Sequence, residues 1–271
     1  YADHRDLHSF PPRRSSDLAR IASAVGTPCY VYSRAILEQQ WRLFDDAFGD
    51  YPHRIHYAVK ANGNLAILNL LCQMGSGFDI VSGGELERVL KAGGRPDDVV
   101  FSGVGKRESE ITSALETGIH CINVESAAEL DRVDRIAGTL GVVADIALRI
   151  NPDVDPHTHP YIATGLRETK FGVPTDQVPD LVRQAHDASH VKIIGLACHI
   201  GSQLTELSPF TAALDRVLDL VFSLRQEGLQ LKHLDIGGGL GIRYGDETPP
   251  EPDAYVEALL NTLSEIGRAH V

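Results

Sequence analysis

The sequence contains no apolar run as long as the roughly 18 residues that a membrane-spanning helix needs, and its first residues form no apolar signal-peptide core. Basic residues are in deficit, because 25 Lys and Arg stand against 37 Asp and Glu, a formal net charge of −12. Since a nucleic-acid surface needs clustered Lys and Arg, this balance argues against nucleic acid as a main partner. We therefore expect a cytoplasmic protein that binds neither membrane nor nucleic acid.

Cysteine is also scarce. The four cysteines are scattered without a CxxC pair, and three of them lie within apolar runs. This pattern is typical of reduced core thiols in a cytosolic protein. The hydrophobic content of 43% and the charged content of 23% suit a globular enzyme, and 271 residues suffice for one large α/β domain or two average ones.

The two ends of the chain look foreign to the rest. The nucleotide string CGC TCT TCC GAT CT encodes residues 14–18, and its reverse complement, read in another frame, encodes residues 266–269. Such a matched pair is typical of adaptor sequence translated at both ends of an insert. We expect residues 1–17 and 266–271 to be non-native tails.

From residue 54 onward a short β-branched run, a polar or Gly-rich turn and a helical stretch recur in that order. Strands are predicted at residues 56–60, 78–81, 99–102, 121–124, 145–150, 193–199 and 233–236. Helices are predicted at residues 64–74, 84–92, 109–117, 126–140, 178–187 and 209–227. This alternation predicts a parallel sheet, and seven consecutive units favour a (β/α)₈ barrel, one strand short of complete, over a doubly wound sheet. The barrel would span residues 51–265, and residues 18–50 would lead into it with an isolated strand at residues 28–32 and a helix.

Reactive residues of a parallel barrel gather at the carboxyl ends of its strands. Lys60 falls at such an end, where a lysine is either a surface side chain or a desolvated amine suited to a Schiff base. His199 ends another predicted strand and is either a site residue or a core histidine. Asp79 and Arg149 lie inside apolar runs, where a charge is costly without a partner.

A triple glycine follows the seventh predicted strand. Gly237, Gly238 and Gly239 would let backbone N–H groups approach a phosphate, and barrel phosphate sites favour this loop. The loop is not a dinucleotide-binding fingerprint, because Ile242 occupies the position of its last small residue. Two other segments are weak signals: residues 103–107 lack the first Gly and the Ser or Thr of a P-loop, and residues 153–159 are an improbable metal site.

Together these residues resemble the fold-type III enzymes that use pyridoxal 5′-phosphate (PLP), whose barrels are of the alanine racemase type. Residues 57–62, Tyr-Ala-Val-Lys-Ala-Asn, match the signature around the PLP lysine of the ornithine, arginine and diaminopimelate decarboxylases. The resemblance implies that Lys60 carries PLP and that His199 stacks on its ring. It assigns the phosphate to Ser202 and to Gly237, Gly238 and Gly239, and it places Asp79 and Arg149 in the wall of the pocket.

Within that group, residues 151–172 resemble the diaminopimelate decarboxylases, which implies decarboxylation of meso-diaminopimelate to L-lysine, with a homodimer at full length. Relative to this family, the Glu-Pro-Gly-Arg segment and the C-terminal β-domain are missing, so the chain itself is expected to be inactive. Two alternatives stay open: a decarboxylase of ornithine or arginine, and a PLP-carrier barrel without catalysis.

Overall fold

The computed structural model describes residues 13–155 and 170–269, and the chain divides into two units between Gln40 and Trp41. The first unit contains helix α1 (Arg13–Val25) and the beginning of α2 (Arg34–Phe48). The second unit contains the remainder of α2 and every described strand. Among the described helices, none is long and apolar enough to cross a membrane.

The second unit is built on one parallel sheet. Its strands follow the order β1 (His56–Ala58), β2 (Gly77–Ile80), β3 (Val99–Phe101), β4 (Cys121–Val124), β5 (Ala144–Asn151), β7 (Val191–Cys198) and β8 (His233–Asp235). A two-residue strand, β6 (Val173–Pro174), pairs with the end of β5. Among the described strands, β1 and β8 have a single partner each, so the sheet is an open barrel wall. The predicted barrel fold is confirmed.

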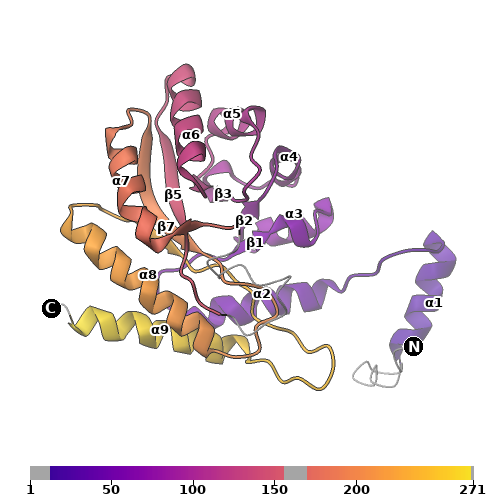
Figure 1. Ribbon diagram of the computed structural model, residues 1–271. Coiled ribbons are helices and arrows are strands. Elements are labelled where there is room, and N and C mark those ends of the chain that lie inside the picture. Colours follow the sequence, from indigo (N-terminus) through magenta and orange to yellow (C-terminus); the bar gives the residue numbers. More distant parts are fainter. Residues whose placement is uncertain (1–12, 156–169, 270–271) are drawn as a thin grey trace. The chain divides into compact units, whose positions relative to one another are not determined.

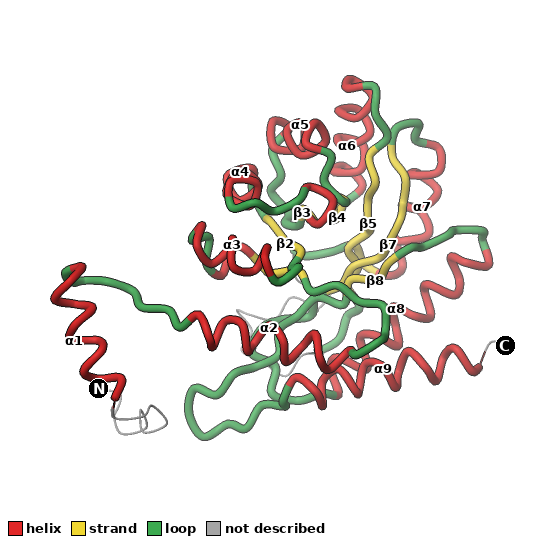
Figure 2. Tube along the Cα trace, turned by 180° about the vertical axis from the view of Figure 1, so that it is seen from behind, coloured by secondary structure: helices red, strands yellow, loops and turns green. Residues whose placement is uncertain are grey.

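Helices follow the strands round the outer side of this sheet (Figures 1 and 2). They are α3 (Leu65–Gln73), α4 (Gly83–Lys91), α5 (Glu108–Thr117), α6 (Ala127–Leu140), α7 (Val178–Asp187) and α8 (Ser208–Gln226), and α9 (Pro252–Ala269) packs against α8. Within the described ranges, the connections also contain single turns of 3₁₀ helix at η2 (Val59–Ala61), η3 (Pro96–Asp98) and η4 (Thr175–Gln177).

The helices after β2 and β4 begin in the same way. Ser82 accepts a hydrogen bond from the N–H of Glu85, and Ser126 accepts one from the N–H of Glu129. Each glutamate in turn accepts the N–H of the residue before its serine. A serine followed three residues later by glutamate satisfies the orphan donors of a helix N-terminus, which fixes where each strand ends and its helix starts.

Side chains alternate between the helix layer and the interior along each strand, as the two-residue period of a strand requires. Those that face the helices are apolar and fully buried, such as Phe78, Ile80, Ile122, Val124 and Leu148. Those that face the interior include an apolar cluster of Val100, Cys121, Ala147 and Ile194. Nearer the carboxyl ends they are polar, such as Asp79, Asn123 and Arg149. The sheet therefore presents its polar residues at one end of its inner face.

The expected strand at residues 28–32 is wrong. The structure has no strand there, and Tyr30 is 91% exposed. A strand needs a hydrogen-bonding neighbour, and no described strand pairs with this segment. The strand predicted at residues 56–60 is two residues too long, because the chain turns into η2 after Ala58.

The predicted domain boundaries remain predictions. Helix α1 begins at Arg13, inside the segment expected to be a tail, and α9 continues to Ala269. Most of the expected tail at residues 1–17, and residues 156–159 of the weak metal candidate, lie outside the described residues.

Candidate active site

Five charged or titratable residues converge at the carboxyl ends of the strands. Lys60 lies in η2 directly after β1, Asp79 in β2, Arg149 in β5, His199 directly after β7, and Asp235 at the end of β8. Lys60, Arg149 and Asp235 act electrostatically on both Asp79 and His199. Lys60, Asp79, Arg149 and His199 are predicted site residues, and the structure brings all four together.

Asp79 is held in an unusual state for a carboxyl group. Burial raises the pKa of Asp79 to about 6, and the nearby carboxylate of Asp235 acts in the same direction. The hydroxyl of Ser102 and the charges of Lys60 and Arg149 oppose this shift. Asp79 Oδ1 is buried and has no hydrogen-bond partner among the described residues. Since buried polar atoms are nearly always paired, this oxygen indicates that a donor belongs beside it.

His199 is a neutral ring at physiological pH. Burial lowers the pKa of His199 to about 4, and the positive charges of Arg149 and Lys60 lower it further than burial alone. Its Nδ1 accepts the N–H of Gly238 at 3.4 Å. A neutral, flat ring beside a lysine is suited to stacking on an aromatic cofactor.

The glycine loop is closed tightly against the loop that follows His199. A Cβ at Gly239 would lie 1.9 Å from the carbonyl oxygen of Gly201, and Gly239 has φ +105°. Leu204 donates its N–H to Gly239 O at 2.9 Å, and Gly241 donates to Leu204 O at 2.8 Å. Ser202 lies in the first of these joined loops and is exposed. The two loops therefore form one cradle in which only glycine fits at position 239.

The N–H groups of this cradle are partly engaged within the protein. Gly237 donates to Asp235 Oδ1 at 2.8 Å, and Gly238 makes its long contact with His199. A phosphate oxygen is a stronger acceptor than an imidazole nitrogen at 3.4 Å. The cradle and the unpaired oxygen of Asp79 thus fit a phosphate-bearing cofactor with a hydrogen-bond donor.

Arg149 is anchored by a residue that the sequence analysis missed. Glu125 Oε1 accepts from Arg149 Nη1 at 2.9 Å and from the N–H of Gly103 at 2.9 Å, while Glu125 Oε2 accepts the N–H of Gly172 at 3.2 Å. Glu125 is 6% exposed, so this ion pair is buried and its acceptors are filled. Its place directly after β4 was the signal that could have found it.

Asn123 and Ser102 were missed as well. Asn123 Nδ2 donates to Ser102 Oγ at 3.1 Å and to Asp235 Oδ2 at 3.3 Å, and so connects β3, β4 and β8 beneath the site. The lysine of the P-loop-like segment has a structural role: Lys106 Nζ is buried and bonds Glu129 Oε1, Gly103 O and Asn123 O.

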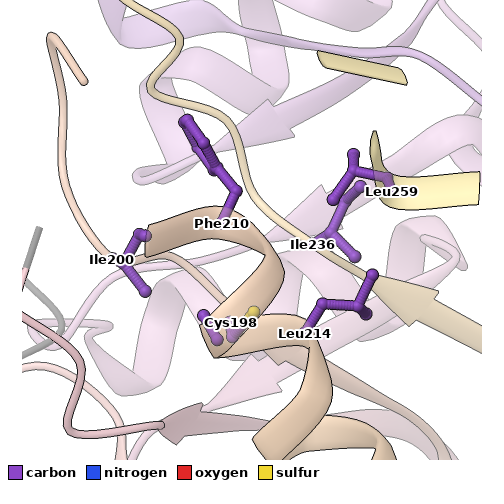
Figure 3. A pocket seen from close by; sticks show the side chains of 7 residues that line it. Cys198, Ile200, Phe210, Leu214, Ile236 and Leu259 are labelled. Carbon is purple, nitrogen blue, oxygen red and sulfur yellow. The ribbon is translucent and has the colours of Figure 1, made fainter. Parts of the chain in front are cut away.

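An apolar pocket lies behind the site, between the sheet and the helices α8 and α9 (Figure 3). Its lining includes Cys198 and Ile236, the neighbours in sequence of His199 and Gly237, together with Phe210, Leu214 and Leu259. Burial raises the pKa of the Cys198 thiol to about 12, which keeps it protonated. None of the described residues that line this pocket is charged, so it supports the loops rather than binding a phosphate.

A parallel barrel wall whose strand ends gather a lysine, a neutral histidine and a glycine cradle is typical of a cofactor-binding α/β-barrel domain. Residues 34–271 match the family described as pyridoxal-dependent decarboxylase, pyridoxal binding domain. The chain belongs to this family.

Relatives with curated names agree. The chain is 59% identical over 246 residues to the diaminopimelate decarboxylase of Vibrio cholerae and 56% identical over 244 residues to that of Haemophilus influenzae, covering 91% and 90% of this chain. It covers 59% of either relative, so it spans about three fifths of the length of the curated relatives it matches. The crystal structure of the Helicobacter pylori diaminopimelate decarboxylase complexed with L-lysine has a TM-score of 0.89 and 40% identity, and the match covers 91% of this chain and 63% of that one.

Proposed function

We propose that the chain is the PLP-binding barrel of a carboxy-lyase that converts meso-2,6-diaminopimelate to L-lysine and CO₂. The observation that carries the proposal is the convergence of Lys60, Asp79, Arg149 and His199 at the strand ends of a domain 59% identical to a diaminopimelate decarboxylase. The solved Helicobacter pylori relative is described in complex with L-lysine, the product expected of this reaction.

Each of the proposed site residues has a separate role that follows from its chemistry. Lys60 would hold the cofactor through its amine, and His199, as a neutral aromatic ring, would pack against it. The cradle of Ser202, Gly237, Gly238 and Gly239 anchors the phosphate. Bound PLP would accept the electron pair that remains when CO₂ leaves. With the ring and phosphate fixed, the pocket can hold the scissile bond perpendicular to the ring.

Asp79 and Arg149 line the pocket with groups of different kinds, a carboxyl group and a guanidinium group. Glu125 holds the Arg149 side chain in place, while the buried carboxyl of Asp79 offers the unpaired Oδ1 to a donor on the cofactor.

We further propose a homodimeric enzyme of lysine biosynthesis in the cytoplasm, without a membrane or nucleic-acid partner. The net charge of −12 and four free thiols support this placement. The resemblance to the family supports the dimer.

To test this, the PLP-loaded protein at its natural full length is incubated separately with diaminopimelate, ornithine and arginine. The rate of CO₂ release is measured for each. We expect the fastest release from diaminopimelate. The Lys60→Ala variant should release none, whereas Lys91→Ala, on the surface of α4, should match the unchanged protein. Faster turnover of ornithine or arginine would reassign the substrate, and PLP retention without CO₂ release from any substrate would identify a carrier.

A further inference from the structure

A second group of chemically reactive side chains lies at the opposite, amino ends of the strands. Cys121 is the first residue of β4, His120 precedes it, and His233 is the first residue of β8. One ligand atom from each lies within 4.8 Å of the other two. Cys121 Sγ and His233 Nε2 are 3.9 Å apart, and the rings of His120 and His233 have centroids 5.2 Å apart.

The backbone beside His233 leaves room for its imidazole ring. Gly195 is the register partner of His233 on β7, and a Cβ at Gly195 would lie 2.4 Å from His233 Nε2. Only glycine therefore allows the imidazole to lie across the neighbouring strand. Cys121 and His233 occupy the same inner face as Asn123 and Asp235, one residue pair further from the candidate active site.

The donors have the chemistry of a zinc site. Zinc in proteins prefers Cys sulfur and His nitrogen in tetrahedral arrangement. Bonds of about 2.3 Å to sulfur and 2.0–2.1 Å to nitrogen place two such ligand atoms about 3.6 Å apart, close to the 3.9 Å between Cys121 Sγ and His233 Nε2. His233 faces Cys121 Sγ with Nε2, while its other ring nitrogen, Nδ1, is buried and has no hydrogen-bond partner among the described residues.

The charges around the cluster are mixed but mostly negative. Asp145 and Asp235 act on the His233 ring as negative charges, and Asp145 acts on His120 in the same way, whereas Arg54 acts on His120 as a positive charge. Zinc binds the thiolate of cysteine and the neutral imidazole of histidine, so binding here would release the Cys121 thiol proton to solvent.

We propose that His120, Cys121 and His233 form a zinc site of three protein ligands at the amino ends of the strands, with the fourth tetrahedral position filled by water. The ion joins β4 to β8 across the inner face, at the end of the barrel opposite to Lys60. The site is independent of the proposed decarboxylation, because no residue of the PLP pocket is a ligand.

The test uses the protein at its natural full length, purified without a histidine tag and stripped of metal. Titration with ZnCl₂ followed by calorimetry should give one ion per chain. Cys121→Ser and His233→Gln should each weaken binding by more than about 100-fold, beyond the 10–100-fold that orienting partners of metal ligands cost. Cys72→Ser, on α3, and His186→Gln, on the exposed surface of α7, should bind zinc as the unchanged protein does.

Cobalt supplies a readout that locates the metal. Co²⁺ should give a near-ultraviolet thiolate charge-transfer band that Cys121→Ser abolishes and Cys72→Ser keeps. If Cys121→Ser does not fold by circular dichroism, His120→Gln takes its place and should shift the band. Zinc binding that survives Cys121→Ser and His233→Gln, zinc lost from His199→Gln instead, or no binding above the stripped protein would each overturn the proposal.

Discussion

Asn123 Nδ2 donates a hydrogen bond to Asp235 Oδ2 at 3.3 Å across the inner face of the sheet. The strands of these residues, β4 and β8, are separated by β5 and β7. In a flat sheet three strand spacings would place them roughly 14 Å apart, which is more than the two side chains can span. The bond therefore requires a sheet curved as in a barrel, and this curvature brings the strand-end residues into one site.

The first prediction concerns the residue that carries PLP. Borohydride reduction of the PLP-loaded protein, followed by peptide mapping, should place the pyridoxyl label on Lys60. Lys106 should stay unlabelled because its ammonium is buried in three hydrogen bonds. A label on Lys106 or on Lys170 would contradict the assignment.

The His199→Ala variant should lose cofactor with little loss of fold. Aromatic contacts contribute about 0.5–1.5 kcal/mol, so PLP retention should weaken by about 3- to 10-fold, and His199→Phe should recover part of it. Retention is measured by dialysis and absorbance, and stability by thermal unfolding, with His190→Ala as the control. A core histidine would behave in the opposite way: the variant would lose stability while its folded fraction bound PLP normally.

Gly239→Ala should damage the cradle, whereas Gly238→Ala should not. The Cβ at position 239 would meet Gly201 O at 1.9 Å, but a Cβ at position 238 has nothing within 4 Å. We expect Gly239→Ala to reduce the free energy of unfolding by at least about 2 kcal/mol and Gly238→Ala to change it by less than about 0.5 kcal/mol. Urea unfolding of the PLP-free protein checks both, and equal effects would refute the tight packing of the two loops.

Asp79 should make the PLP-free protein less stable as pH rises from about 4 to about 6. Its folded-state pKa of about 6 exceeds the ordinary value of 3.8, so in this window the folded state binds more protons than the unfolded chain. The free energy of unfolding then falls with rising pH, by up to about 3 kcal/mol in total. Asp79→Asn should remove this decline and stabilise the protein at pH 7. Asp187→Asn, on the exposed end of α7, is the control, and an unchanged pH slope in Asp79→Asn would exclude the shift.

Glu125→Gln should be among the more destabilising single changes in the barrel. It leaves the charge of Arg149 buried without its counter-charge, which costs about 3–5 kcal/mol. Glu108→Gln removes the exposed partner of Arg135 and should cost less than about 1 kcal/mol. Chemical unfolding measures both, and the double variant Glu125→Gln with Arg149→Met should recover part of the loss. Similar small effects for Glu125 and Glu108 would show that the buried pair is dispensable.

The strands could be predicted closely because a parallel strand covered by helices is a short run of β-branched and apolar residues bounded by turns. Residues 121–124, for instance, form β4 with both predicted bounds. The segment at residues 28–32 has the same composition but no neighbour to pair with. Composition indicates the capacity to form a strand, and pairing decides whether it forms.

The site was predictable only in part for a related reason. Lys60 and His199 follow strands whose ends are visible in the sequence, and the glycines are a local pattern. Asn123 and Asp235 are 112 residues apart, and their contact depends on which strands meet across the curved sheet. Lys106 belongs to a segment that resembles a P-loop, but its structural role depends on its buried ion pair with Glu129.

The strand order of the sheet has a consequence for synthesis. Each strand from β2 onward pairs with a strand that precedes it in the chain, so a nascent chain can add strands in the order in which they leave the ribosome. At about 5–20 residues per second, each strand–helix unit has seconds in which to dock before the next one arrives. The polar contacts across the interior, such as that between Asn123 and Asp235, must wait for β8. The apolar layer between strands and helices can thus form before the titratable groups of the pocket meet. Asn123 and Asp235, whose polar side chains are costly to bury, come into contact last.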